Sequence, residues 1–271
     1  FFVDLTPTDP GAAAHSYAVS VACVAGCDLG YTRHPIVLMH GMGGTDAYFE
    51  LVTYFYGVAD ALESEGYAVL TPTVDPFAVT SVRAEDWRLH LDGLVAEGVG
   101  RRFNLIGHSQ GGLDARYLAS LSDPNLTVAS ITTVGTPHRG TPVADVFSGL
   151  LDITVLTAYT LDALADGLSA LIGSGADQDV LDQIAFLSTE EMADFNDAVP
   201  DRADVAYASW AGLTCSALDF DCIDETGGEV VDPLLGVSFA ILAAMSEDSD
   251  GMVPVSSAQW GTFLGTLPAD H

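Results

Sequence analysis

Lysine is absent from this sequence, and basic residues of any kind are few. The eight basic residues are all arginine and stand against 38 Asp and Glu, so the formal net charge is −30 over 271 residues. Such an acidic surface repels nucleic acids and anionic membranes, and we expect neither of them as a partner. High solubility or adaptation to a salty habitat explains the acidity itself.

Long hydrophobic runs are also absent. No apolar stretch reaches the roughly 20 uninterrupted residues that a membrane-spanning helix needs, so we expect no transmembrane segment. Segment 150–172 comes closest, but Asp152, Asp162 and Asp166 interrupt it. The chain begins at Phe1 rather than Met and shows no signal-peptide pattern, so we expect that it has been processed or trimmed.

Cysteine is scarce, and its four residues form two close pairs, Cys23 with Cys27 and Cys215 with Cys222. Neither pair has the C-x-x-C spacing of a zinc site, and no histidine lies near enough in the sequence to complete one. An even number of locally paired cysteines predicts two small-loop disulfides and an exported protein. Four free, buried thiols are the alternative.

The residues that are present form a regular alternation of short apolar elements. Hydrophobic residues make up 49% of the chain and the mean hydropathy is +0.31, which supports a sizeable core and argues against disorder. The pattern predicts strands at 35–40, 67–71, 103–107, 128–134 and 205–210, and helices at 54–65, 84–98 and 111–121. This alternation predicts an α/β fold with a mostly parallel central sheet and helices on both faces.

The second half of the chain departs from this alternation. Residues 141–198 lack an obvious strand and are expected to be helical, either as core helices or as a mobile lid over a substrate site. An acidic, cysteine-containing excursion follows at 211–232, and 237–246 is expected to be another strand or buried segment. Without a repeat or a low-complexity linker, residues 1–271 are predicted to form a single domain with a helical lid inserted at 141–198.

The most informative motif is the G-x-S-x-G pentapeptide at Gly107-His108-Ser109-Gln110-Gly111. It lies between a short apolar strand and a helix, which is the context that a nucleophile elbow requires. In that turn the serine backbone is held in an unfavourable conformation and the Oγ stands clear of the sheet. Ser109 is therefore the candidate nucleophile, and an ordinary serine in a glycine-rich turn is the alternative.

A serine nucleophile needs a general base and a carboxylate that orients this base. In proteins with an elbow of this kind, the three residues follow one another along the chain as serine, acid and histidine. Of the seven histidines, only His271 comes late enough in the chain to follow the acid. Asp250, at a predicted strand end, is the favoured acid, and Asp248 is the second candidate. Because a catalytic base at a bare chain end would fray, we expect the natural protein to extend beyond His271.

Acyl transfer also requires donors for the oxyanion of the tetrahedral intermediate. We expect one from the main-chain N–H of Gln110, the residue after the serine, and the other from Met42 in the loop after the first buried strand. The glycines at 41–44 lack the G-x-G-x-x-G pattern of a dinucleotide site, so that interpretation is set aside. No cofactor is expected in the catalysis itself.

Seven motifs spread over residues 35–271 carry a family resemblance. They are His40–Asp46, Tyr54–Val58, Asn104–Leu113, Thr133–Gly140, Leu187–Thr189, Tyr207–Gly212 and Asp250–Val253. Together they resemble the true lipases of Pseudomonas and Burkholderia, within the α/β-hydrolase family. The resemblance implies an α/β-hydrolase fold and a secreted triacylglycerol lipase that hydrolyses water-insoluble carboxylic esters. It places the catalytic triad on Ser109, Asp250 and His271.

The same resemblance implies a structural calcium ion. One ligand in the family is an Asp upstream of the catalytic acid, and Val231-Asp232-Pro233 matches its context, so Asp232 is the candidate ligand. The other ligands of the family follow the histidine, where this chain stops. The resemblance also implies a steric foldase as a possible partner during secretion, whereas the usual cysteine after the catalytic acid is replaced here, at Ser256 or nearby.

These observations favour an extracellular, monomeric enzyme that cleaves acyl esters through an acyl-enzyme intermediate. A short-chain carboxylesterase or polyester hydrolase would use the same triad with a more open cleft. Two non-catalytic alternatives are a binding protein on an α/β-hydrolase scaffold and a salt-adapted structural surface protein. The intact triad argues against the first, and the second rests on charge alone.

Overall fold

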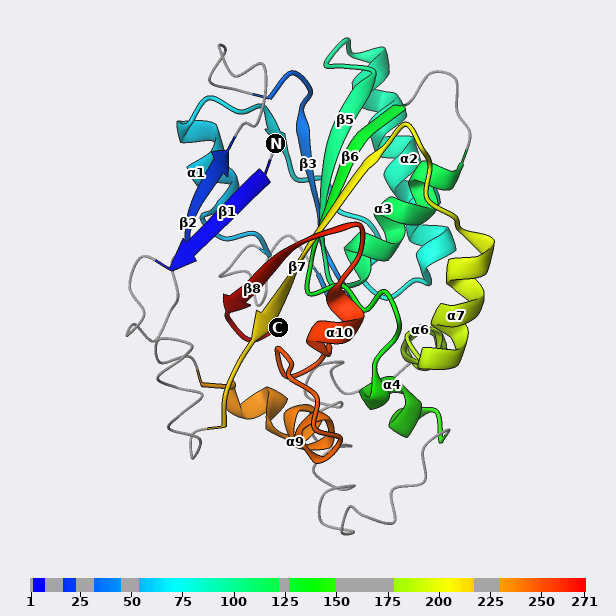
Figure 1. Cartoon of the computed structure of the whole chain (residues 1–271). Coiled ribbons are helices and arrows are strands. Elements are labelled where there is room, and N and C mark those ends of the chain that lie inside the picture. Colours follow the sequence, from blue (N-terminus) through cyan, green and yellow to red (C-terminus); the bar gives the residue numbers. More distant parts are fainter. Residues whose placement is uncertain are drawn as a thin grey trace.

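The computed structural model describes residues 2–7, 17–22, 32–44, 54–121, 127–149, 178–216 and 230–271. Its centre is a six-stranded sheet in the order β4-β3-β5-β6-β7-β8, and every neighbouring pair is parallel (Figure 1). The strands are β3 (Ile36–Met39), β4 (Val69–Leu70), β5 (Arg102–His108), β6 (Thr127–Val134), β7 (Ala206–Leu213) and β8 (Thr262–Pro268). The predicted α/β class with a parallel sheet is confirmed.

Helices cover both faces of this sheet. The helices of the described ranges, some of which lie beyond the sheet, are α1 (Val58–Ser64), α2 (Thr80–Ala96), α3 (Gln110–Ser120), α4 (Pro142–Phe147), α6 (Gln178–Phe186), α7 (Thr189–Ala198), α9 (Gly236–Ala244), α10 (Val255–Ala258) and the 3₁₀ turn η1 (Pro233–Leu235). Strand β3 shows why: Val37 and Met39 pack with residues of α2 and α3, whereas Ile36 and Leu38 pack with Leu62 of α1. Successive side chains of a strand point to opposite faces. Figure 1 accordingly shows α2 and α3 together on one side and α1 on the other.

Two parts of the fold were not predicted. An antiparallel hairpin of β1 (Phe2–Pro7) and β2 (Tyr17–Ala22) precedes the first strand that the sequence predicts, at 35–40. Strand β8 completes the sheet beside β7, although its sequence contains Gly265 and ends at Pro268. Glycine and proline weaken a strand pattern, and an edge position is where a sheet tolerates them.

For 237–246 a strand or a buried segment was expected; the strand is wrong, because Gly236–Ala244 form the helix α9, and the segment is buried only along part of this helix. Its residues are almost all apolar, so neither a period of two nor one of 3.6 stands out in the sequence. In the structure Ser238, Ile241 and Leu242 are buried, and their spacing of three and four residues is that of one helix face. Met245, just after the helix, is 46% exposed.

The predicted lid at 141–198 is described only at its two ends, because residues 150–177 lie outside the described residues. Helix α4 precedes that range, and α6 and α7 follow it, so the described flanks are helical as expected. Ile184 of α6 and Met192 of α7 pack in one cluster with Leu113 of α3. A lid, and the division into one domain with an insertion, stay predictions.

The carboxyl ends of the parallel strands meet at one edge of the sheet. Ser109 follows β5 directly, His271 lies shortly after β8, and Asp250 lies against Gly212 near the end of β7. In open α/β sheets this is the edge at which ligands bind. Among the helices in the described ranges, none is long and apolar enough to cross a membrane.

Candidate active site

Ser109 forms a sharp turn between strand and helix. Strand β5 ends at His108 and α3 begins at Gln110, so the serine alone connects them. Its φ is 53° and its ψ is −131°, a backbone conformation that residues other than glycine rarely adopt. A Cβ at Gly107 would lie 2.5 Å from the main-chain N of Gly112, so the close approach of strand and helix requires glycine there. The structure thus contains the elbow that the pentapeptide predicts.

The three residues predicted as a triad lie in one hydrogen-bonded row. The Oγ of Ser109 lies 2.8 Å from Nε2 of His271, and Nδ1 of His271 lies 2.8 Å from Oδ2 of Asp250. Ser109 is 9% exposed and Asp250 is 2% exposed. The fold therefore brings together residues 162 and 21 positions apart in a site that is largely screened from water.

Main-chain contacts fix the Asp250 carboxylate in its orientation. Its Oδ1 accepts the N–H groups of Met252 at 3.0 Å and of Val253 at 2.7 Å, which leaves Oδ2 for the imidazole. The main-chain N–H of His271 donates to the Asp250 carbonyl at 2.8 Å, so the two residues are joined by backbone as well as side chain. A Cβ at Gly212 would lie 2.6 Å from the Cβ of Asp250, so this strand position has room only for glycine.

The two histidines at the site differ in their electrostatics. Burial opposes protonation of His271, but the Asp250 carboxylate beside it raises its pKa above the ordinary 6.5. For His108, burial first and then the neighbouring His271 lower the pKa to about 3, although Asp250 acts in the opposite direction. The two ring centroids are 4.8 Å apart. At neutral pH His108 is therefore uncharged, and His271 is the one of the two that can take up a proton.

The two predicted oxyanion donors lie next to Ser109 in the fold. A Cβ at Gly41 would lie 2.7 Å from the Cβ of Ser109, so the loop that contains Met42 runs directly beside the serine. Gln110 is the first residue of α3 and is completely buried. Within the described part of the chain, the main-chain N–H of neither Met42 nor Gln110 donates to another residue. Both can therefore donate to an oxyanion on a substrate bonded to Ser109.

The second candidate for the acid, Asp248, takes no such position. It is exposed, and its main-chain carbonyl accepts the N–H of Val255 at 2.8 Å. Asp250, two residues on, is the carboxylate that contacts His271. Asp250, the acid that the sequence favoured over Asp248, is thus the one that the structure places in the hydrogen-bonded row with His271 and Ser109.

The calcium candidate Asp232 contacts Asp270, the residue before His271. Its carboxylate accepts the N–H of Leu234 at 2.8 Å, and its own N–H donates to Oδ2 of Asp270 at 3.0 Å. Calcium takes about six to eight oxygen ligands. Among the residues that the structure describes, no group of three or more His, Cys, Asp or Glu could hold a metal ion. These residues alone do not make a calcium site, and calcium stays a prediction.

Two residues at the site were not found by sequence reasoning. Oη of Tyr54 lies 2.6 Å from Nδ1 of His108 and accepts the N–H of Gly41 at 3.0 Å. Gln183 of α6 donates to the side-chain oxygen of Gln110 and, at 3.0 Å, to the main-chain carbonyl of Ala78, which precedes α2. Tyr54 lies within a motif that carried the family resemblance, and this was the one available signal for it.

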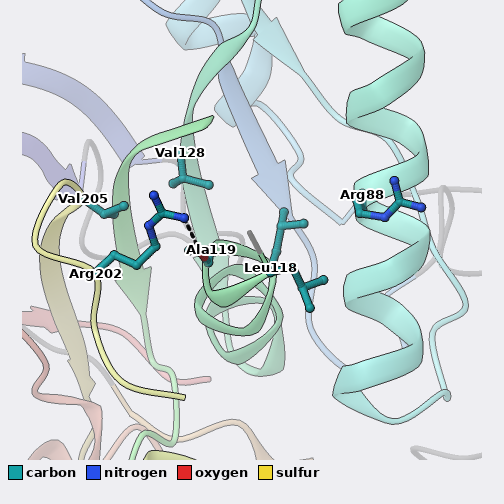
Figure 2. Close-up of a pocket in the computed structure, with 7 residues that line it drawn as sticks. Arg88, Leu118, Ala119, Val128, Arg202 and Val205 are labelled. Carbon is teal, nitrogen blue, oxygen red and sulfur yellow. Dashed lines mark hydrogen bonds between the residues drawn. The ribbon is translucent and has the colours of Figure 1, made fainter. Parts of the chain in front are cut away.

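A pocket at the other end of the sheet is separate from this site. Figure 2 shows Arg202 beside Ala119 at the end of α3, with Arg88 on the neighbouring helix α2. Arg202 pairs with Asp204 at 2.8 Å, and Arg88 pairs with Asp92 at 2.5 Å. Because carboxylates already pair with both guanidinium groups, we assign the pocket no part in the chemistry.

The class of protein follows from where the serine stands. In serine hydrolases with this fold, the serine stands on an elbow after a central strand of a parallel sheet. The acid and the histidine come from later segments of the chain. The family model described as "Alpha/beta hydrolase family" matches residues 36–263. The chain belongs to the alpha/beta hydrolase family.

Individual relatives narrow this assignment. The chain is 37% identical to a triacylglycerol lipase of Burkholderia plantarii over 94% of this chain and 82% of that protein. It is also 37% identical to a triacylglycerol lipase of Pseudarthrobacter phenanthrenivorans over 87% and 86% of the two chains. The crystal structure of the mature Bacillus licheniformis lipase BlEst2 shares the fold, with a TM-score of 0.64 at 21% identity over 88% of this chain and 84% of that one. The resemblance to bacterial lipases is thereby confirmed.

Proposed function

We propose that the protein is a triacylglycerol lipase, a serine hydrolase that cleaves the carboxylic esters of water-insoluble acyl lipids. The observation that carries the proposal is the hydrogen-bonded row of Ser109, His271 and Asp250. The identity to two bacterial triacylglycerol lipases over most of each chain supports the substrate class. Catalysis then follows in two half-reactions.

In the first half-reaction the Oγ of Ser109 attacks the ester carbonyl carbon while its proton passes to Nε2 of His271. Asp250 accepts the Nδ1–H of the imidazole and stabilises the imidazolium that forms. The N–H groups of Met42 and Gln110 donate to the oxyanion of the tetrahedral intermediate. When this intermediate collapses, the bond to the alcohol oxygen breaks and His271 gives its proton to that oxygen. The alcohol leaves, and the acyl group stays on Ser109.

In the second half-reaction a water molecule loses a proton to His271 and attacks the acyl carbon. The same two N–H groups stabilise the second oxyanion. Collapse breaks the bond to Ser109, whose oxygen takes the proton back from His271, and the carboxylic acid is released. The enzyme returns to its starting state without a cofactor.

Hydrolysis of p-nitrophenyl esters from C2 to C16 and of an emulsified triacylglycerol tests the proposal. Ser109→Ala should lower kcat by a factor of about 10⁴ or more, because the nucleophile is lost. Ser64→Ala, which removes an exposed hydroxyl from α1, is the matched control and should keep wild-type activity. Activity that survives in Ser109→Ala would exclude the mechanism.

Substrate preference separates the related activities. A long-chain optimum with triacylglycerol hydrolysis supports the lipase, whereas a short-chain optimum would indicate a carboxylesterase or polyester hydrolase. A wild-type protein that hydrolyses none of these esters would instead support a binding protein on the same scaffold. Repeating the assay with EDTA tests calcium: a loss of activity that calcium restores supports a metal site at Asp232, and unchanged activity excludes a required metal.

We also propose that the protein acts outside the cytoplasm. Cys215 is buried and disulfide-bonded, and disulfides persist in oxidising compartments. The predicted pairs Cys23–Cys27 and Cys215–Cys222 each include residues outside the described ranges and stay predictions, as do a foldase and a monomeric state. Esterase activity in the cell-free culture medium of a producing strain would check export, and activity confined to the cells would contradict it.

A further inference from the structure

The loop beside the nucleophile is held by hydrogen bonds on both of the peptide groups that meet at Gly41. We call residues 40–44 the oxyanion loop, because it contains Met42. The main-chain N–H of Val74 donates to Nε2 of His40, so the proton of this imidazole lies on Nδ1, which donates to the Gly41 carbonyl at 2.9 Å. That carbonyl and the Met42 N–H belong to one planar peptide group and point in opposite directions. The Gly44 N–H donates to the same carbonyl at 3.2 Å, so His40 and Gly44 together set the direction of the Met42 N–H.

The preceding peptide group is held from the other side by Tyr54. Its Oη accepts the Gly41 N–H at 3.0 Å, while Arg83 donates to the His40 carbonyl at 2.5 Å. The ring of Tyr54 packs against that of His40, with centroids 5.7 Å apart. Because Gly41 is buried, its N–H would have no water to bond if the tyrosine oxygen were removed.

The same tyrosine oxygen also contacts the elbow. It lies 2.6 Å from Nδ1 of His108, the residue before Ser109. The other side of His108 is occupied by His271, whose ring centroid is 4.8 Å away at an angle of 40°. A single oxygen atom thus connects the loop that carries one oxyanion donor to a ring packed against the catalytic base.

We propose that Tyr54 is a positioning residue for the hydrolytic reaction, whose hydroxyl holds the oxyanion loop and the His108–His271 ring pair in register. The inference rests on the proposed function, because it concerns the same site. The hydroxyl touches no reacting atom. It acts through Gly41 on the Met42 N–H, and through His108 on the orientation of His271.

Tyr54→Phe tests this proposal, because it removes one oxygen atom and keeps the ring that packs on His40. The oxyanion donor and the base matter most in the transition state, so kcat should fall while KM changes by less than about twofold. Complete loss of an oxyanion donor costs about 10²–10³ in kcat, and misplacing one should cost on the order of tenfold. Labelling of Ser109 by a phosphonate, which mimics the tetrahedral state, should slow by the same factor.

The matched control is Tyr56→Phe, which removes a hydroxyl two residues away from a side chain that is 76% exposed. It should leave kcat and the labelling rate unchanged. His108→Leu removes the other partner of Tyr54 and carries the same test if Tyr54→Phe does not fold. His108→Asn keeps a polar atom near the position of Nδ1 and should retain more activity than His108→Leu.

A double-mutant cycle decides between coupling and independent damage. If the two residues act together, Tyr54→Phe combined with His108→Leu should lose little more activity than either single variant. A folded Tyr54→Phe protein with wild-type kcat and labelling rate, or a double variant whose losses multiply, would overturn the proposal. Failure of the proposed function is distinguishable, because a wild-type protein inactive on every ester can still be tested by phosphonate labelling of Ser109.

Discussion

At the scale of single residues, protonation at the site depends on two neighbouring imidazoles with opposite shifts. The Asp250 carboxylate raises the pKa of His271, whereas burial lowers that of His108 to about 3. A charged His108 would repel the imidazolium that His271 becomes in the proposed reaction. Its neutrality leaves His271, whose pKa is raised, as the imidazole of this pair that takes up a proton first as the pH falls.

The raised pKa of His271 predicts the pH profile. The imidazole must be neutral to accept the proton of Ser109, so kcat/KM should rise with pH through a midpoint above 6.5. Asp250→Asn removes the larger of the two carboxylate charges that raise this pKa, the other being that of Asp270, so the midpoint should move down and kcat should fall by on the order of 10⁴. Initial rates on a soluble ester between pH 5 and 9 measure both effects.

The exposed Asp248 supplies the control for this pH experiment. Asp248→Asn removes a carboxylate two residues from Asp250 that does not contact His271, so the midpoint should stay where it is in the wild type. A wild-type midpoint at or below pH 6.5, or an equal shift in both variants, would contradict the assignment of the acid.

At the scale of elements, the elbow helix is fixed to its neighbour by a buried ion pair. Nε of Arg83 in α2 donates to Oδ2 of Asp114 in α3 at 2.7 Å, and both side chains are completely buried. The indole N–H of Trp87 donates to the same oxygen at 3.2 Å. Arg83 also reaches the His40 carbonyl of the oxyanion loop, so this contact joins α2, α3 and the loop.

Breaking this pair should destabilise the fold strongly. Asp114→Ala leaves the Arg83 guanidinium buried without its counter-charge, which costs about 3–5 kcal/mol in free energy of unfolding. The control is Asp92→Ala, whose partner Arg88 lies on the outside of α2, with side chains 35% and 25% exposed. A pair of that kind contributes at most about 0.5 kcal/mol. Urea unfolding followed by circular dichroism measures the difference, and equal losses would refute the argument.

The sequence predicted those elements whose constraints are local. The elbow was accessible because a tight turn requires glycines beside Ser109, and β5 and α3 carry clear strand and helix patterns around it. His271 was found by elimination along the chain, and Asp250 by its position before it. Helix α9 was missed because an almost continuous apolar run, here Gly236–Ala244, has no visible period.

Contacts between elements that are distant in the chain could not be predicted from local sequence patterns. The Tyr54–His108 hydrogen bond joins residues 54 positions apart, and nothing in either local pattern indicates the other. The sequence indicates no role for His108 beyond its place in the pentapeptide, and none for His40 beyond its place in a motif of the family resemblance. Their positions depend on how β3 and β5 pair in register, which only the assembled sheet determines.

At the scale of the whole molecule, the acidic surface acts on every part of the fold. The net charge of −30 repels itself, and this repulsion is stronger in the compact state than in the unfolded chain. Salt weakens it, because the Debye length falls from about 10 Å at 0.1 M to about 3 Å at 1 M. The polar contacts at the active site are partly or fully buried and are screened much less.

We therefore expect sodium chloride to raise the melting temperature between about 0.05 and 1 M. An increase of about 1 kcal/mol in the free energy of unfolding raises the melting temperature by roughly 2–4 °C for a domain of this size. Asp60, Glu63 and Glu65 are exposed on and beside α1, and replacing them with Asn, Gln and Gln changes the net charge from −30 to −27. This variant should melt higher in low salt and respond less to added salt. Sorbitol at matched osmolality controls for solute effects without screening, and an equal rise in sorbitol would contradict the electrostatic cause.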